Sequence, residues 1–296
     1  MKEGRPSFTA EGTAAMRGAE SLRPADKRVC YDPYAKDFVG LKFRLIGKSR
    51  FLTKMTVWCA EMLVPGMMAY IVGRTRYIDD YVKARIADGI EQLVIMGAGY
   101  DSRAYRFEEL KGRVKVFEVD FPATQKVKME RVKKVFGSLP LHVVYTSVDF
   151  NTQKLGERLF ESGYDRNRKT LFIWEGVTPY VTPQAMDETL GFVANNSGKG
   201  SSIIFDYVLK SALDGTCRRG QVNRIRRAYE LIGAPLTSEG VGFGMEDGKT
   251  EEYLSQRGFC EVKNVTGESF GTSYLKKTSP NLKVWCTVYA TVKPKP

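Results

Sequence analysis

Gly97, Ala98 and Gly99 form a glycine turn that directly follows an apolar run, residues 93–96. Glycine lacks a Cβ atom, so the chain can turn sharply there and a ligand can lie against its backbone. An acidic residue, Asp120, ends the next apolar run, about twenty residues after the turn. In a βαβ unit, an acid at that distance binds the two hydroxyls of an adenosine ribose. These residue types at this spacing predict a nucleoside-binding site.

The turn departs from the pattern that binds a dinucleotide. That pattern has a third glycine, but Arg103 stands near its place. The departure favours S-adenosylmethionine over NAD as the cofactor. A pair of glycines also occurs in turns that are purely structural, which is the alternative interpretation. The apolar strand before the turn and the acid after it favour the cofactor, and Phe121, next to Asp120, is included in the predicted site.

Acids also follow two later apolar runs. Asp149 and Phe150 end the third run, where the acid can accept a hydrogen bond from an adenine amino group while the ring covers the base. Glu175 and Gly176 end the fourth run, where we expect the methionine part of the cofactor. A single acid at the end of a strand is often only a helix cap. Acids at three strand ends of one sheet are harder to explain by capping.

The chain contains one histidine, His142, which restricts the catalytic chemistry. Triads that need a histidine are excluded unless His142 takes part, and its place at the start of an apolar strand favours a structural role. A phenol or alcohol acceptor would need a base, for which Asp206 and Tyr207 are the candidates. A carboxylate acceptor would need none, because it is already ionised at neutral pH.

Apolar strands alternate with amphipathic helices from residue 90 onward, which predicts a parallel sheet with helices on both faces. Ligands bind at the carboxyl ends of the strands in such sheets. Two later strands, near 259–266 and 282–292, are expected to form a hairpin at the sheet edge. The other expected elements are strands near 92–96, 114–119, 141–147, 170–175 and 201–207, and helices near 102–110, 122–136, 152–162, 183–196 and 247–257.

Residues 1–89 are expected to form a helical cap that contributes to the cofactor site of a core, residues 90–296. We expect a helix near 13–21, which carries Arg17, and a helix through 73–82, which carries Arg74. Between them, Asp32 and Pro33 are typical of a helix start. The sequence therefore predicts helical structure from residue 31 to about residue 64, broken near residues 47–49.

An insertion at about residues 208–246 interrupts the strand and helix pattern. It combines five arginines with a glycine-rich stretch, and its place after the fifth strand predicts a lid over the strand ends. The alternative is a solvated surface decoration. If the insertion is a lid, its charge favours an anionic acceptor. The arginines are Arg218, Arg219, Arg224, Arg226 and Arg227.

The 296 residues carry a formal net charge of +12, which suits nucleic acid, an anionic membrane surface or an anionic small molecule, and distinguishes among none of them. Five scattered cysteines without a paired spacing predict no metal site and a reducing cytoplasm. The most apolar run, residues 62–72, is too short to span a bilayer, and the start of the chain is not a secretory signal. The oligomeric state is not defined by the sequence.

The ordered set of motifs resembles the leucine carboxyl methyltransferase family, particularly its microbial members. The resemblance implies a class I, Rossmann-like methyltransferase fold: a mostly parallel seven-stranded sheet with added N-terminal helices and a lid. It also implies that Arg17 and Arg74 pair with the carboxylate of S-adenosylmethionine, while the strand-end residues line the cofactor. The motifs are Tyr31-Asp-Pro-Tyr34, Gly73-Arg-Thr-Arg-Tyr-Ile-Asp79, Gly97-Ala-Gly-Tyr-Asp-Ser-Arg-Ala-Tyr105, Phe117-Glu-Val-Asp120, Asp149-Phe150, Trp174-Glu-Gly-Val-Thr-Pro-Tyr180 and Phe205-Asp-Tyr207.

The leading hypothesis is in-line methyl transfer to a carboxylate or hydroxyl oxygen of a small, anionic molecule, with the carboxyl terminus of a polypeptide as a narrower alternative. Transfer to nitrogen or carbon stays open. A nucleic-acid-binding protein or methyltransferase is a second class, but the sequence has no Asn-Pro-Pro-Tyr motif and no added RNA-binding module. An NAD-dependent reductase is disfavoured by the missing third glycine and by the lack of a suitable Tyr-x-x-x-Lys pair.

Overall fold

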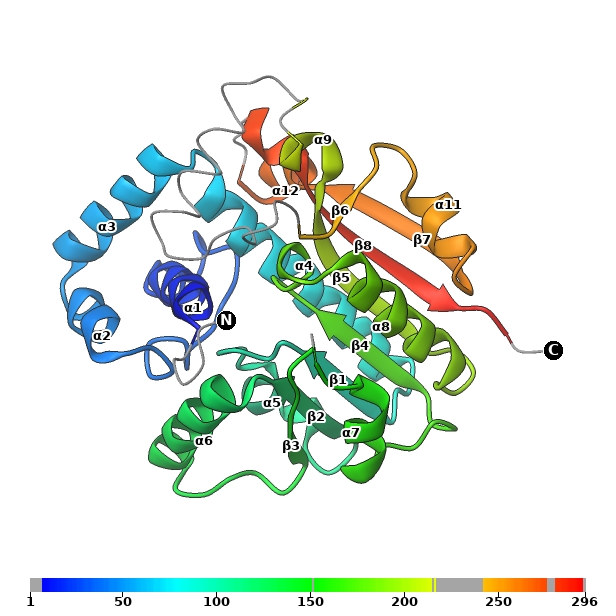
Figure 1. Cartoon of the computed structure of the whole chain (residues 1–296). Helices are drawn as coiled ribbons and strands as arrows, with labels where there is room; N and C mark the ends of the chain where they lie inside the picture. Colours follow the sequence, from blue (N-terminus) through cyan, green and yellow to red (C-terminus); the bar gives the residue numbers. More distant parts are fainter. Residues whose placement is uncertain (1–6, 151, 215, 217–241, 276–279, 295–296) are drawn as a thin grey trace.

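A computed structural model describes the chain except for residues 1–6, 151, 215, 217–241, 276–279 and 295–296. Its framework is one sheet in the order β3-β2-β1-β4-β5-β8-β7, with the short β6 paired to β5 (Figure 1). The strands are β1 (Gln92–Met96), β2 (Lys115–Asp120), β3 (Val143–Ser147), β4 (Thr170–Trp174), β5 (Ser202–Leu209), β6 (Gly244–Met245), β7 (Phe259–Thr266) and β8 (Trp285–Val292).

Strands β1 to β5 are parallel, whereas β8 runs antiparallel to both β5 and β7. Strand β1 pairs with β2 on one side and β4 on the other, so the strand order reverses beside the glycine turn that follows β1. Such a reversal opens a crevice at the carboxyl ends of the strands, where ligands bind in this class of sheet. The predicted α/β fold is confirmed. The described residues form eight strands rather than seven, because the short β6 adds two residues to the sheet.

Helices cover both faces of the sheet (Figure 1). Because neighbouring side chains on a strand point to opposite faces, β1 contributes to two separate cores. Val94 packs in a core that includes Leu190, and Ile95 packs in a core that includes Ile78. The helices are α1 (Phe8–Ser21), α2 (Leu41–Lys48), α3 (Arg50–Leu63), α4 (Met67–Ala87), α5 (Arg103–Arg106), α6 (Pro122–Phe136), α7 (Leu155–Glu161), α8 (Pro183–Asn195), α9 (Lys210–Leu213), α11 (Thr250–Ser255) and α12 (Gly267–Phe270).

The N-terminal helices α1, α2 and α3 lie on the side of the molecule away from β7 and β8 (Figure 1). The predicted helix start at Asp32 and Pro33 is wrong, because the next helix begins at Leu41. The Asp32 side chain caps only a turn, through a 3.0 Å hydrogen bond from the Ala35 backbone N. Its carboxylate also accepts a hydrogen bond from Ser102, and these tertiary contacts hold the segment in turns.

The predicted helix at 102–110 is also shorter than expected. It divides into α5 and a 3-10 turn at Glu108–Leu110, separated by Phe107 in an extended conformation. The arginines of the predicted lid lie outside the described residues. Before them, β5 continues to Leu209 and leads into α9.

Candidate functional site

The glycine turn after β1 has the backbone geometry that the sequence predicts. Gly97 has a φ of +67° and Gly99 a φ of +42°, a region that favours glycine. A Cβ atom on Gly97 would collide with the Val177 side chain, and one on Gly99 would lie 3.1 Å from the Cβ of Ala10 in α1. The turn is therefore packed closely by the fourth strand end and by the first helix.

Asp120 lies at the end of β2, directly beside this turn. Its Oδ1 accepts a 2.6 Å hydrogen bond from the Phe121 backbone N, and its Oδ2 accepts one from the Gly99 backbone N. Burial raises the pKa of Asp120, although these two backbone hydrogen bonds lower it in part. Among the described residues, Asp120 forms no ion pair, so its remaining lone pairs suit two neutral hydroxyl donors such as a ribose diol.

Arg74, in the middle of α4, connects two other strand ends. Its Nε donates to Glu175 Oε1 at 2.9 Å, and its NH1 donates to Asp206 Oδ2 at 2.5 Å. All three side chains are largely buried. Burial lowers the pKa of the Arg74 guanidinium, but the charges of Asp206 and Glu175 outweigh burial and raise it. A permanent cation is thus held between the ends of β4 and β5.

Arg103 is a site residue that our sequence analysis did not assign. It is 2% exposed and binds Glu175 Oε2 at 2.6 Å, Asp101 Oδ2 at 2.5 Å and Asp79 Oδ1 at 2.7 Å. Burial would raise the pKa of Glu175, but the charges of Arg103, Arg74 and, less strongly, Arg17 lower it overall. Glu175 therefore stays ionised between two guanidinium groups. Arg103 lies inside the motif at residues 97–105 that carries the family resemblance, and this position could have indicated its role in the site.

Arg17, on α1, lies beside this cluster without an ion pair to Glu175. Its Nε binds Asp32 Oδ2 at 2.9 Å, and its NH2 donates to the Tyr100 backbone O at 2.7 Å. Helix α1 is thus hydrogen-bonded to Tyr100, the residue that follows the glycine turn. Asp149 and Phe150 follow β3, and the Asp149 backbone N donates a 3.0 Å hydrogen bond to Gln153 Oε1.

The two candidate catalytic residues face opposite sides of β5. Asp206 Oδ2 accepts a 3.2 Å hydrogen bond from Tyr70 on α4, and its Oδ1 accepts a 2.5 Å hydrogen bond from the backbone N of Gly176, which follows β4. Tyr207 packs in the other core, and its hydroxyl is 2.7 Å from Thr250 Oγ1. The structure brings Asp206 into the arginine cluster and places Tyr207 away from it.

A second buried pair, also missed from the sequence, supports the glycine turn. Glu118 Oε1 lies 2.8 Å from Lys128 Nζ, and Glu118 Oε2 accepts a 2.9 Å hydrogen bond from Tyr105. The Lys128 Nζ also donates to the Ala98 backbone O at 3.3 Å. Burial, only partly offset by Lys128, raises the pKa of Glu118 to about 7.

His142 lies at the amino end of β3, whereas the site residues lie at the carboxyl ends of the strands. Its Nε2 is 2.9 Å from the Ala104 backbone O. In the described part of the chain, no group of three or more histidine, cysteine, aspartate or glutamate side chains could hold a metal ion. No single helix there is long and apolar enough to cross a bilayer. Only the pair Phe51–Met62 and Met67–Ala87, bent by 102°, meets that criterion in length and composition.

The residues at the strand ends fit the parts of S-adenosylmethionine. Asp120 keeps lone pairs beside the glycine turn that suit ribose hydroxyls, and Arg74 beside Glu175 offers a cation and an anion to an amino acid. Together with the reversed strand order, these residues define a class I methyltransferase.

Comparison with known proteins identifies the particular family. A model of the leucine carboxyl methyltransferase family matches residues 10–194, so the chain belongs to that family. S-adenosylmethionine is accordingly its cofactor.

Individual relatives agree. The chain is 27% identical over 237 residues to YktD of Bacillus subtilis, covering 80% of this chain and 75% of that protein. It is 31% identical over 258 residues to a Mycolicibacterium smegmatis protein, covering 85% and 81%. Both relatives are named as S-adenosyl-L-methionine-dependent methyltransferases. A Thermobifida fusca crystal structure named as a methyltransferase has the same fold, with a TM-score of 0.60 at 13% identity, covering 99% of this chain and 97% of that one.

Proposed function

We propose that this enzyme methylates an oxygen atom, most favourably a carboxylate, of a small anionic molecule by in-line transfer. One observation carries the proposal. Glu175 lies between the Arg74 and Arg103 guanidinium groups, whose charges lower its pKa, so it is poorly suited to take up a proton. Asp206 accepts a hydrogen bond from Arg74 with one oxygen and from the Gly176 backbone N with the other. A general base needs a free lone pair at the acceptor and a proton affinity suited to the task. A carboxylate acceptor makes such a base unnecessary, because it is ionised at neutral pH.

The same contacts support a separate role for each site residue in binding the cofactor. When bound, the cofactor supplies an electrophilic methyl group. Asp120 binds the ribose hydroxyls, and Asp149 with Phe150 holds the adenine at the neighbouring strand end. Arg74 pairs with the carboxylate of the cofactor, and Glu175 pairs with its ammonium. Asp206 acts as a positioning residue, because it fixes both the Arg74 guanidinium and the Gly176 backbone.

The division of the chain into a cap, residues 1–89, and a core, residues 90–296, is part of this proposal. Ala10 packs against Gly99, Arg17 binds the Tyr100 backbone, and Arg74 reaches the ends of two core strands. These contacts support a cap that helps to exclude water from the reacting atoms. The lid role of residues 208–246 and a cytoplasmic location stay predictions. A role of Tyr207 at the acceptor is disfavoured by its place on the other face of β5.

An acceptor screen tests the proposal. The enzyme is incubated with S-adenosylmethionine carrying a labelled methyl group. The acceptors are matched pairs of aromatic carboxylic acids and phenols, together with amines and peptides. Label in a product that mild alkali releases as methanol would identify a methyl ester and support a carboxylate acceptor. Label that alkali does not release, on phenols or amines only, would contradict it. Label on the carboxyl terminus of a peptide, without any on small acids, would favour the polypeptide alternative.

A further inference from the structure

The apolar side chains of α3 face away from the molecule. Phe51, Met55, Trp58 and Met62 follow the four-three-four spacing that places side chains on one face of a helix. Their exposed fractions are 73%, 46%, 63% and 64%. A surface helix of a globular protein normally turns such a stripe toward the core. In α3 the apolar stripe faces solvent instead.

The opposite face of α3 is the one that packs on the protein, and it carries smaller side chains. Thr53, Val57 and Ala60 are each less exposed than the stripe. Helix α2 continues the apolar surface, because Leu41 is 70% and Leu45 is 53% exposed. We call the exposed side chains Leu41, Leu45, Phe51, Met55, Trp58 and Met62 the α2–α3 surface.

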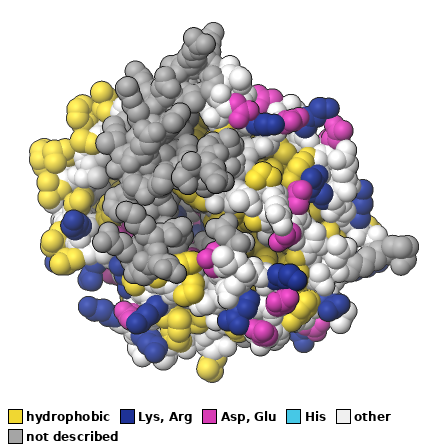
Figure 2. All heavy atoms as spheres, viewed as in Figure 1, with side chains coloured by type: hydrophobic (Ala, Val, Ile, Leu, Met, Phe, Trp, Pro, Cys, Tyr) yellow, Lys and Arg dark blue, Asp and Glu magenta, His cyan; other side chains and the backbone are white. Residues whose placement is uncertain are grey.

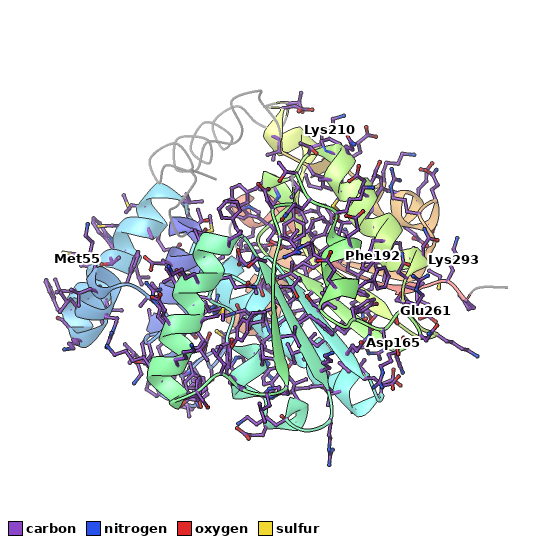
Figure 3. The ribbon with its side chains drawn as sticks, turned by 60° about the horizontal axis from the view of Figure 1, so that its bottom comes forward. Met55, Asp165, Phe192, Lys210, Glu261 and Lys293 are labelled. Atoms are coloured by element: carbon purple, nitrogen blue, oxygen red, sulfur yellow. The ribbon has the colours of Figure 1, made fainter. Side chains whose placement is uncertain are left out.

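This surface forms one margin of the molecule. Figure 2 shows hydrophobic side chains gathered at the left edge, where Figure 1 places α3. Figure 3 places Met55 at the outer edge, remote from the sheet. Exposed apolar side chains scattered singly are ordinary, but a continuous patch marks an interaction site.

The exposed charged residues around this surface are cationic. Lys42, Arg44, Lys48 and Lys54 are exposed on the same two helices. The acid within these two helices, Glu61, accepts hydrogen bonds from the Gly66 and Met68 backbone N atoms at 2.9 Å and 2.8 Å, and the exposed cations outnumber it. An apolar stripe with aromatic residues and flanking cations is the chemistry that binds an anionic lipid surface.

We propose that the α2–α3 surface attaches the enzyme to an anionic bilayer, with the helices lying in the plane of the interface. Helix α3 has 14 residues, about 21 Å at the usual rise, which is less than the ~30 Å hydrocarbon core. Helix α4 is packed in the protein, where residues such as Ile71 and Val82 are buried. The tryptophan suits the boundary between lipid and water.

Self-association through the same surface is disfavoured by its charges. Two copies that met stripe to stripe would bring the Lys42, Lys48 and Lys54 sets together without acids to pair with them, and like charges across an interface oppose binding. A bilayer that contains anionic lipids supplies the missing negative charge.

The fluorescence of Trp58 allows the proposal to be tested directly. The other two tryptophans, Trp174 and Trp285, are buried, so a change in emission on adding lipid reports mainly on Trp58. The full chain is titrated with vesicles of phosphatidylcholine alone or with about one-third phosphatidylglycerol, and sedimentation with the vesicles is measured in parallel. We expect a blue shift and co-sedimentation with the anionic vesicles, at least about tenfold stronger than with neutral ones, and weakened by salt.

Matched variants distinguish binding through the α2–α3 surface from non-specific binding to lipid. Phe51→Ser with Trp58→Ser should reduce vesicle binding about tenfold or more, whereas Leu141→Ser, at a fully exposed leucine elsewhere, should not. Lys42→Glu with Lys48→Glu should abolish the preference for anionic lipid, whereas Lys111→Glu with Lys154→Glu, the same change of net charge, should retain it. Unchanged binding of S-adenosylhomocysteine verifies that each variant is folded.

Two results would overturn the proposal. One is anionic vesicle binding that is no stronger for the wild-type chain than for Phe51→Ser with Trp58→Ser, including no binding by either. The other is a dimer in sedimentation velocity without lipid that Phe51→Ser with Trp58→Ser dissociates, because the surface would then belong to a second copy.

Discussion

Arg74 and Asp206 are separated by 132 residues in sequence, yet the Arg74 NH1 lies 2.5 Å from the Asp206 Oδ2. Arg74 comes from the N-terminal helices and Asp206 from the fifth strand of the core, so this contact joins the two parts of the chain at the site. Asp206 holds the Gly176 backbone with its other oxygen. The proposed binding of the amino-acid end of the cofactor therefore involves residues from both parts.

Arg74→Lys should weaken binding of S-adenosylhomocysteine by about 1–3 kcal/mol, because lysine keeps the charge but loses the planar fork. Binding of 5′-methylthioadenosine, which lacks the amino acid, should not change. Calorimetry measures both ligands. Arg76→Lys, an exposed position on the same helix, is the control, and equal loss for both ligands would show that Arg74 acts only on the structure.

Asp120→Asn should weaken both ligands, because each contains the ribose. The amide replaces one acceptor oxygen by a donor beside the Gly99 and Phe121 backbone N–H groups, and we expect a loss of about 1–3 kcal/mol. The same calorimetric titrations test it. Retention of methylthioadenosine affinity would remove Asp120 from the ribose site.

Glu118 predicts a specific dependence of stability on pH. Its pKa is raised from 4.5 to about 7 in the folded protein, so folding favours the protonated form. This contribution to the free energy of unfolding is fully present below about pH 4.5 and is lost as pH rises toward about 7, by about 3 kcal/mol. Urea unfolding across this range, compared with Glu118→Gln, measures it. A parallel pH dependence in both proteins would contradict the assignment to Glu118.

Gly97→Ala should destabilise the fold more than Gly112→Ala. Both glycines have positive φ, +67° and +71°, so backbone strain of about 1–2 kcal/mol is shared. Only at Gly97 does the new Cβ meet a neighbour, Val177, whereas Gly112 has open space. Equal losses in the free energy of unfolding would show that the Val177 side chain moves aside freely.

Tyr207→Phe tests the weakest of the catalytic assignments. The hydroxyl is 2.7 Å from Thr250 and on the other face of β5 from Arg74. From this geometry we expect a loss of about 1 kcal/mol in stability and a rate of methyl transfer close to that of the wild type. A rate lowered by orders of magnitude, at unchanged acceptor KM, would instead place the hydroxyl at the acceptor.

The parts of the site that follow from local sequence were predictable. Gly97 and Asp120 belong to one βαβ unit, in which spacing along the chain determines spacing in the fold. Arg103 was not assigned from the sequence, because its importance depends on three acids, Asp79, Asp101 and Glu175, that only the folded chain brings together. The Glu118–Lys128 pair was missed for the same reason.

The fold shows a similar division. The alternation of strands and helices predicted the parallel sheet, since hydrophobic periodicity is a local property. The helix start at Asp32 failed because that carboxylate binds Arg17 and Ser102 instead of capping a helix. Periodicity also identifies the apolar face of α3, but it does not reveal that this face points to solvent, which depends on how α3 packs.

We propose that this site binds S-adenosylmethionine through Arg74, Glu175 and Asp120. The most direct test is calorimetric titration of the wild-type chain with S-adenosylhomocysteine and, separately, with NADH. We expect saturable binding of S-adenosylhomocysteine at about micromolar Kd and none of NADH. Binding of NADH, or no binding of S-adenosylhomocysteine by folded protein, would contradict an S-adenosylmethionine site at these residues.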